Sequence, residues 1–120
     1  MKTPTVWIIK EQMLRGEISP VAMDYSPAME FGDIQFVTQF DMPLYNKSQV
    51  QGSWDRDVAV FVEKYDPEQD FVVCTGQPMA IFAVGHSLGI AQKAPRFLVW
   101  RREEGKYRVV NFAPLPPVVV

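Results

Sequence analysis

The sequence contains only one cysteine, Cys74, and only one histidine, His86, among its 120 residues. A single cysteine cannot form a disulfide within the chain, and one cysteine with one histidine cannot supply a Cys/His zinc site. We therefore predict no metal site, and we assign no cofactor. With 48% hydrophobic residues, a chain of this length can bury a sufficient core as a single α/β domain over residues 1–120.

Long apolar runs are also absent. No run approaches the roughly 20 residues of a membrane-spanning helix. The apolar stretch near the N-terminus covers residues 6–9, whereas the core of a signal peptide needs about 7–15 residues. We expect a soluble, cytoplasmic protein without a membrane partner.

The net charge of −2 combines two segments of opposite sign. Residues 33–70 carry eight acidic and three basic side chains, a net of −5, and residues 93–108 carry six basic and two acidic side chains, a net of +4. Clustered Lys and Arg can bind nucleic-acid phosphates, but they also keep a sheet edge soluble and prevent it from pairing with other chains. The pI near 5.3 favours the second interpretation, so nucleic acid is not the partner that we expect.

The apolar periodicity predicts an α/β fold. Runs of β-branched and aromatic residues indicate strands, and an apolar stripe from Val50 to Tyr65 indicates a helix. The expected elements are strands at residues 5–10, 33–41, 71–75, 96–102 and 106–112, helices at residues 49–65 and 79–92, and an irregular connection at residues 11–32. This order, β-β-α-β-α-β-β, implies a small, Rossmann-like, mostly parallel sheet that ends in an antiparallel hairpin.

The second predicted helix contains Gly85-His86-Ser87-Leu88-Gly89, which matches the G-x-S-x-G nucleophile elbow. The only histidine lies inside the motif, next to Ser87, where it cannot act as the base of a triad. We therefore reject a serine hydrolase, assign no catalytic residue, and predict that Ser87 bonds back to its own helix. Each interior glycine weakens a helix by about 1 kcal/mol relative to alanine, so we predict that Gly85 and Gly89 pack closely against the sheet.

Polar residues follow three strands that we predict to be parallel. The carboxyl ends of such strands meet at one edge, where open α/β sheets bind ligands, and a helix N-terminus there attracts anions. The candidate ligand site comprises Lys10, Glu11, Asp41, Thr75, Gly76 and Gln77. The turn at residues 75–78 has a single glycine and matches neither G-x-G-x-x-G nor a P-loop, so the alternative interpretation is a solvated sheet edge.

The connection at residues 11–32 is rich in methionine and aromatic residues, which suits an adaptable protein-binding surface. The candidate partner-binding residues are Met13, Met23, Tyr25, Met29, Arg101 and Arg102. The alternative is that this connection covers one face of the sheet. We expect Cys74 to be a buried thiol and Trp100 to pack into the core. If the strands follow chain order, both helices lie on one face, and a homodimer would cover the other.

Four segments, VWIIKEQ, MDYSPAMEFGDI, DPEQDFVVCTGQPMAIFAVG and PRFLVWRREEGKYRVV, together cover much of the chain. In their general texture they resemble the small, uncharacterised α/β proteins of tailed bacteriophages. The resemblance implies a protein that binds and redirects a host component, and it transfers no catalytic residue.

We therefore expect a non-enzymatic cytoplasmic binding protein, encoded by a phage as an accessory protein that acts on a host protein. The alternative is a small-nucleotide or anion-binding α/β domain that uses the Thr75-Gly76-Gln77-Pro78 turn, in which case catalysis remains open.

Overall fold

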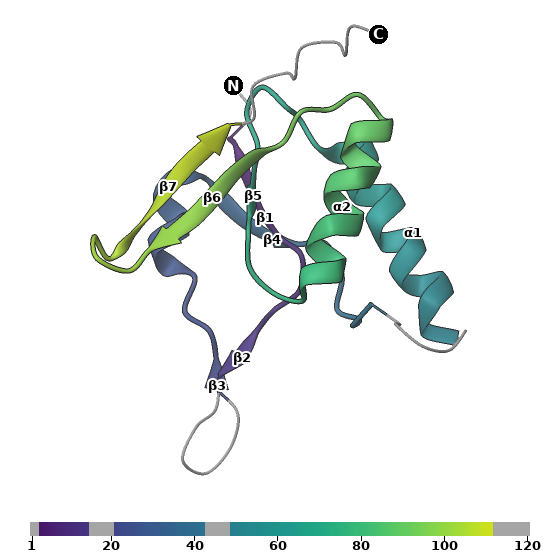
Figure 1. Ribbon diagram of the computed structural model, residues 1–120, viewed down its shortest axis with the longest axis horizontal. Coiled ribbons are helices and arrows are strands. Elements are labelled where there is room, and N and C mark those ends of the chain that lie inside the picture. Colours follow the sequence, from purple (N-terminus) through teal and green to yellow (C-terminus); the bar gives the residue numbers. More distant parts are fainter. Residues whose placement is uncertain (1–2, 15–20, 43–48, 112–120) are drawn as a thin grey trace, which may run out of the picture.

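The computed structural model describes residues 3–14, 21–42 and 49–111. These residues form an α/β fold with one mixed five-stranded sheet (Figure 1). The elements are β1 (Thr5–Ile8), β2 (Met13–Leu14), β3 (Val21–Ala22), the 3-10 helix η1 (Ser26–Phe31), β4 (Asp33–Phe36), α1 (Gln49–Lys64), β5 (Phe71–Val73), α2 (Pro78–Ile90), β6 (Arg96–Arg101) and β7 (Lys106–Asn111). No helix within these three ranges is long and apolar enough to cross a membrane.

The strands of the sheet lie in the order β4-β1-β5-β6-β7. β1 pairs in parallel with both β4 and β5, β5 pairs in parallel with β6, and β6 and β7 form the expected antiparallel hairpin. Gly105 lies in the hairpin turn at φ +63°, a conformation that glycine adopts without strain. The strands do not follow chain order, which was the condition for expecting a homodimer, because the chain passes from β1 to the edge strand β4 and then returns across β1 to β5.

Both α-helices pack on one face of the sheet, where they lie side by side in Figure 1. The predicted stripe of α1 is buried, with Trp54, Val58, Phe61 and Tyr65 at helical spacing. Trp7 of β1 meets Phe61 edge to face, with ring centroids 5.0 Å apart. This face holds the larger of the two hydrophobic clusters, to which α2 contributes Ala80, Val84 and Leu88.

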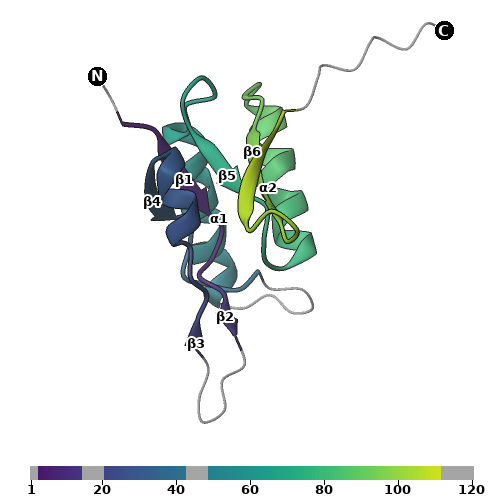
Figure 2. The same ribbon diagram turned by 90° about the vertical axis from the view of Figure 1, so that its left-hand side faces the viewer.

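The opposite face of the sheet is covered by the connection that follows β1. This connection is less irregular than predicted, because it contains the short hairpin of β2 and β3 and the 3-10 helix η1. Tyr25 and Ala28 are buried against this face, and Phe31 contacts Phe71 with ring centroids 5.5 Å apart. The reason for expecting a homodimer is therefore removed, since the chain covers its own second sheet face. The hairpin of β2 and β3 projects away from the sheet (Figure 2).

A buried carboxylate joins the sheet to the connection that follows α1. Asp70, just before β5, is 1% exposed. Its carboxylate accepts hydrogen bonds from the Thr5 backbone N–H at 2.9 Å, the Trp7 Nε1–H at 3.3 Å and the Asp66 backbone N–H at 2.9 Å. A buried charge is tolerated where several donors satisfy it. Asp70 therefore fixes the position of β1 relative to the end of α1.

Two cations of the basic segment serve the fold. The Lys93 ammonium donates to the backbone carbonyls of Val62, Glu63 and Tyr65 at 2.6, 3.0 and 2.9 Å, which caps the C-terminus of α1. The Arg96 guanidinium lies 4.0 Å above the ring of Phe71 and donates to the Asp70 carbonyl. Neither cation is therefore free to contact a phosphate.

Candidate functional site

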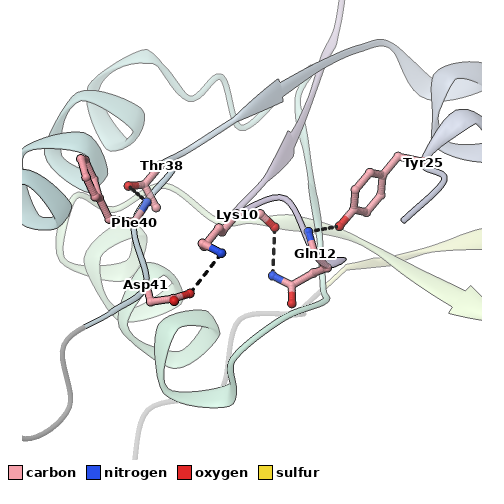
Figure 3. A network of polar contacts seen from close by, with 6 residues as sticks. All are labelled: Lys10, Gln12, Tyr25, Thr38, Phe40 and Asp41. Atoms are coloured by element: carbon pink, nitrogen blue, oxygen red, sulfur yellow. Dashed lines mark hydrogen bonds and ion pairs between the residues drawn. The ribbon is translucent and has the colours of Figure 1, made fainter. Parts of the chain in front are cut away.

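Two parts of the surface carry candidate sites. The first is the carboxyl edge of the sheet, where β1 and β5 end. The Lys10 Nζ lies 3.2 Å from the Asp41 carboxylate, so the structure brings together two of the predicted ligand-binding residues (Figure 3). Gln12 turns its amide back to the Lys10 carbonyl at 3.0 Å, and its backbone N–H donates to the Tyr25 hydroxyl at 3.1 Å.

The turn at Gly76 and Gln77 completes this edge as predicted. Gly76 has φ +114°, and a Cβ there would lie 3.0 Å from the Gln12 Nε2, so glycine suits both the backbone conformation and the space. Pro78 begins α2, and the N-cap Gln77 makes no side-chain cap hydrogen bond. The first N–H groups of a helix have no intrahelical acceptor, so the first turn of α2 presents free donors at this edge.

A small cavity of about 40 Å³ lies at this point, which we call the edge cavity. It is lined by residues of α1 and α2 and of the segments that follow β1, β4 and β5: Ile9, Lys10, Gln12, Phe40, Asp41, Met42, Trp54, Gly76, Gln77 and Ala80. Trp54 is buried, and its indole Nε1–H has no hydrogen-bond partner among the residues that the structure describes. Trp54 was not predicted as part of this site, because its helical spacing indicated only a core position.

Two predicted ligand-binding residues lie elsewhere. Glu11 lines a separate open hollow of about 590 Å³ with Lys10, Thr38 and Asp57. In that hollow the buried Thr38 Oγ1 donates to the Asp57 carboxylate at 2.8 Å. The same hydroxyl accepts from the Phe40 backbone N–H at 3.1 Å (Figure 3). Thr75 lines another hollow, with Met23, Asp24, Cys74, Trp100 and Tyr107. The predicted convergence of all six residues on one rim is therefore wrong for Glu11 and Thr75.

The second part of the surface is an apolar groove of about 720 Å³ between α2 and the β6–β7 hairpin, which we call the α2 groove. Its lining residues are Cys74, Ile81, Phe82, Gly85, His86, Gly89, Pro95, Phe97, Val99 and Val110. Phe82 is 75% exposed, and Ile90 and Met79 of the same helix are also exposed. An apolar patch of this kind typically marks a site that binds another molecule.

The two glycines of α2 do not pack against the sheet, which corrects the prediction. A Cβ at Gly85 or at Gly89 would meet no atom of residues 3–14, 21–42 or 49–111 within 4 Å. Both residues lie on the wall of the α2 groove. Periodicity could not separate the buried and open sides of α2, because this helix is apolar almost all round.

The structure tests three further predictions about this region and confirms one of them. The Ser87 Oγ donates to the Ala83 carbonyl at 2.9 Å, which confirms that Ser87 bonds within its own helix. Cys74 was expected to be buried, but it is exposed, since β5 ends at Val73. Trp100 was expected in the core, but it is 45% exposed and rests on Tyr107 with ring centroids 5.0 Å apart.

The floor of the α2 groove continues into basic side chains. Phe97 and Val99 belong to the helix-facing cluster, so alternation along β6 places Arg101 on the same face. In the register of the hairpin, Val110 pairs with Phe97, Arg108 with Val99 and Lys106 with Arg101. Arg108 forms a bidentate ion pair with Glu104 at 2.7 and 2.9 Å, which lowers the pKa of the Glu104 carboxyl. Arg101 and Lys106 form no ion pair with another described residue.

The predicted partner surface on residues 11–32 is only partly exposed. Tyr25 is 6% exposed and belongs to the core, so its assignment to a partner surface is wrong. Burial raises the pKa of its hydroxyl. Met29 is exposed, Met23 is half-buried, and the side chain of Met13 lies outside the described residues. Arg101 and Arg102 are exposed.

Among the described residues, no group of three or more His, Cys, Asp or Glu side chains could hold a metal ion. A family model described as "Phage Pam3 gp32-like protein" matches residues 4–114 of the chain. This match confirms the resemblance to phage proteins. No curated protein and no solved structure matches the chain.

Proposed function

Since this chain belongs to the Phage Pam3 gp32-like protein family, we propose that it is a phage accessory protein that binds a protein of the host cytoplasm and is not an enzyme. The binding surface in this proposal is the α2 groove. It replaces most of the surface expected from residues 11–32, and it retains Arg101 at one end. The observation that carries the proposal is the open space above Gly85 and Gly89, beside the exposed ring of Phe82.

The energetic argument rests on apolar area. Burial of apolar surface stabilises by about 25 cal/mol per Å², and a fully buried aromatic side chain contributes about 150–250 Å². Leaving Phe82 exposed in the α2 groove therefore forgoes about 1.5–3 kcal/mol of hydrophobic stabilisation. A bound partner recovers that free energy, and the glycines let its backbone approach α2 closely.

Binding accounts for the G-x-S-x-G segment better than catalysis does. The Ser87 hydroxyl is engaged with its own helix, and His86 lies on the exposed wall of the α2 groove, beside the two glycines. These residues form one side of a docking surface in our proposal, with no catalytic role assigned to them.

Affinity capture from a lysate of the phage's bacterial host tests this function. The wild-type chain and a Gly85→Leu variant are immobilised at equal density. The leucine side chain projects into the α2 groove from an open Cβ position. We expect one defined host protein to be retained by the wild type and lost from the variant. Equal retention by both chains, or retention of nothing by the wild type, contradicts the proposal.

A second candidate function is binding of a small anion, such as inorganic phosphate or the phosphate of a nucleotide, at the edge cavity. We interpret the strand order as Rossmann-like, with connections leaving β1 toward β4 and reaching β5 across β1. Ligands of open α/β sheets bind where the strand order reverses. The edge cavity lies at that place, since it is lined by residues that follow β1 and β5.

The donors around the edge cavity favour this second candidate. The first turn of α2 lacks a side-chain cap, the Trp54 indole N–H has no acceptor in the described part of the chain, and Lys10 is held nearby. The negative charge of Asp41 repels an anion, but its side chain is 83% exposed and can turn into solvent. The volume of about 40 Å³ suits one small group or a water molecule.

Thermal unfolding with inorganic phosphate and with a nucleotide panel separates the two functions. A ligand at about 100 times its dissociation constant adds about 2.7 kcal/mol of stability. We expect the shift to disappear in Lys10→Ala and to persist in Lys64→Ala, which lies on α1 away from the edge cavity. An equal shift in both variants, or no shift with any of these anions, contradicts the second candidate.

A further inference from the structure

The α2 groove has the form of an unoccupied helix position. Figure 1 shows α1 and α2 side by side, with the β6–β7 hairpin extending past α2 on the side away from α1. The helix-facing side chains of that hairpin, Phe97, Val99 and Val110, form the floor of the groove, and α2 forms its wall. A third helix lying beside α2 would cover this floor in the way that α1 and α2 cover the rest of the sheet.

We propose that the host partner inserts an amphipathic α-helix, with acidic residues in its first turn, into the α2 groove. This inference rests on the proposed protein-binding function and names the class of partner. Three observations carry it: the gap above the glycines, the basic end of the groove, and the length of its floor.

The two glycines determine how closely the inserted helix approaches α2. Packed helices lie about 8–10 Å apart, depending on the side chains between them. Gly85 and Gly89 are one turn apart on the wall of the groove, and no described residue has an atom within 4 Å of either Cβ position. A helix with small residues at the contact fits this gap, while its larger apolar residues meet Phe82 and Val99.

Basic side chains at one end of the α2 groove favour acidic residues on the inserted helix. Arg101 and Lys106 pair across the hairpin on the groove side, beyond Val99, and neither forms an ion pair with another described residue. α2 runs from the carboxyl edge of the sheet, where β6 ends at Arg101, back toward the start of β6. A helix parallel to α2 therefore begins beside Arg101, and acidic residues in a first turn also interact favourably with the helix dipole.

The floor of the groove sets the length of the helix. From Phe97 to Arg101 the strand advances by about 13 Å, which corresponds to about nine helical residues. A second copy of the chain offers no such helix, because α2 carries no acidic residue and the apolar stripe of α1 is buried. Charge and burial therefore favour a different protein as the occupant.

Fluorescence anisotropy with synthetic peptides tests the inference. The probe is a labelled amphipathic peptide of about 16 residues, long enough to form a helix in part, with two glutamates in its first turn. One control peptide has the same composition with its leucines out of helical register, and another has lysines in place of the glutamates. We expect the labelled peptide to bind Gly85→Leu at least about tenfold more weakly than it binds the wild type, a difference of about 1.4 kcal/mol. We also expect Arg101→Glu to prefer the lysine peptide.

Five outcomes overturn the inference, and the last of them leaves the proposed function intact. The first is that the out-of-register peptide binds the wild type as tightly as the amphipathic probe does. The second is that the probe binds Gly85→Leu as tightly as it binds the wild type. The third is a wild-type dimer in sedimentation that Gly85→Leu converts to a monomer, which assigns the groove to a second copy. The fourth is peptide binding only by a chain that ends at Asn111, which assigns the groove to the chain's own C-terminal segment. If the peptides fail while Gly85→Leu still loses a captured host protein, the helical class of partner is wrong and the proposed function stands.

Discussion

Gly85 of α2 and Val110 of β7 line the same apolar groove, one from its wall and the other from its floor. The glycine was expected to pack against the sheet, yet its Cβ position is open. This relationship places the surface that we assign to binding between the last helix and the last hairpin of the fold.

The open glycine predicts a gain in stability on substitution. Gly85→Ala should raise the free energy of unfolding by up to about 1 kcal/mol, because alanine is the better helix former and its Cβ meets no atom. Urea unfolding measures the change. Gly76→Ala is the matched contrast and should destabilise, since Gly76 has φ +114° and crowds Gln12. A loss of stability in Gly85→Ala would show that this glycine is packed after all.

The buried carboxylate of Asp70 predicts a large loss. Asp70→Ala leaves the N–H groups of Thr5, Trp7 and Asp66 without their acceptor. Each unsatisfied buried donor costs about 1–3 kcal/mol, so we expect a total loss of about 3–5 kcal/mol. The control Asp55→Ala, on the exposed side of α1, should change the stability by less than about 0.5 kcal/mol. Similar losses for both variants in urea unfolding would refute the role of Asp70.

The cap formed by Lys93 predicts a local effect on α1. Lys93→Met removes three hydrogen bonds to carbonyls at the end of α1. We expect a loss of about 1–2 kcal/mol and faster amide hydrogen exchange in the last turn of the helix. Lys64→Met removes an exposed cation from the same turn and should cost only about 0.3–0.5 kcal/mol. Unchanged exchange in Lys93→Met would show that the cap contributes nothing.

The tyrosines predict how stability depends on alkaline pH. Burial raises the pKa of Tyr65, Tyr25 and Tyr107 above the usual value. The folded state then holds these protons more tightly than the unfolded state, so their contribution is complete below about pH 10 and is lost as the pH rises through the folded pKa values. Urea unfolding between about pH 8 and about pH 11 should show this decline. Tyr65→Phe should show a shallower decline than the wild type, and an equal slope would contradict this account.

Much of the fold could be predicted because local patterns specify it. The stripe of α1, the turn at Gly76 with Pro78, and the glycine of the hairpin turn each follow from side-chain spacing or backbone preference. Strand order could not be predicted in this way. It depends on how η1 packs over the second sheet face through Tyr25 and Ala28, and these contacts join residues far apart in the chain.

The two candidate sites differ in the same way, because local patterns predicted the edge cavity but not the α2 groove. Lys10, Asp41, Gly76 and Gln77 meet at the edge cavity because parallel strands end at a common edge. The α2 groove was missed because a helix that is apolar all round has no periodicity to reveal which side stays open. The exposure of Cys74 was missed for a related reason, since an apolar run does not show that β5 ends at Val73.

Cys74 offers the most direct measurement, because it is the only cysteine of the chain and lines the α2 groove. The rate at which a thiol reagent modifies Cys74 is measured for the free chain and for the chain with its captured host protein. The account predicts rapid modification of the free chain and at least about tenfold slower modification of the complex, while the Gly85→Leu variant shows no protection by the same protein. Modification at the same rate with and without the bound protein would contradict binding in the groove.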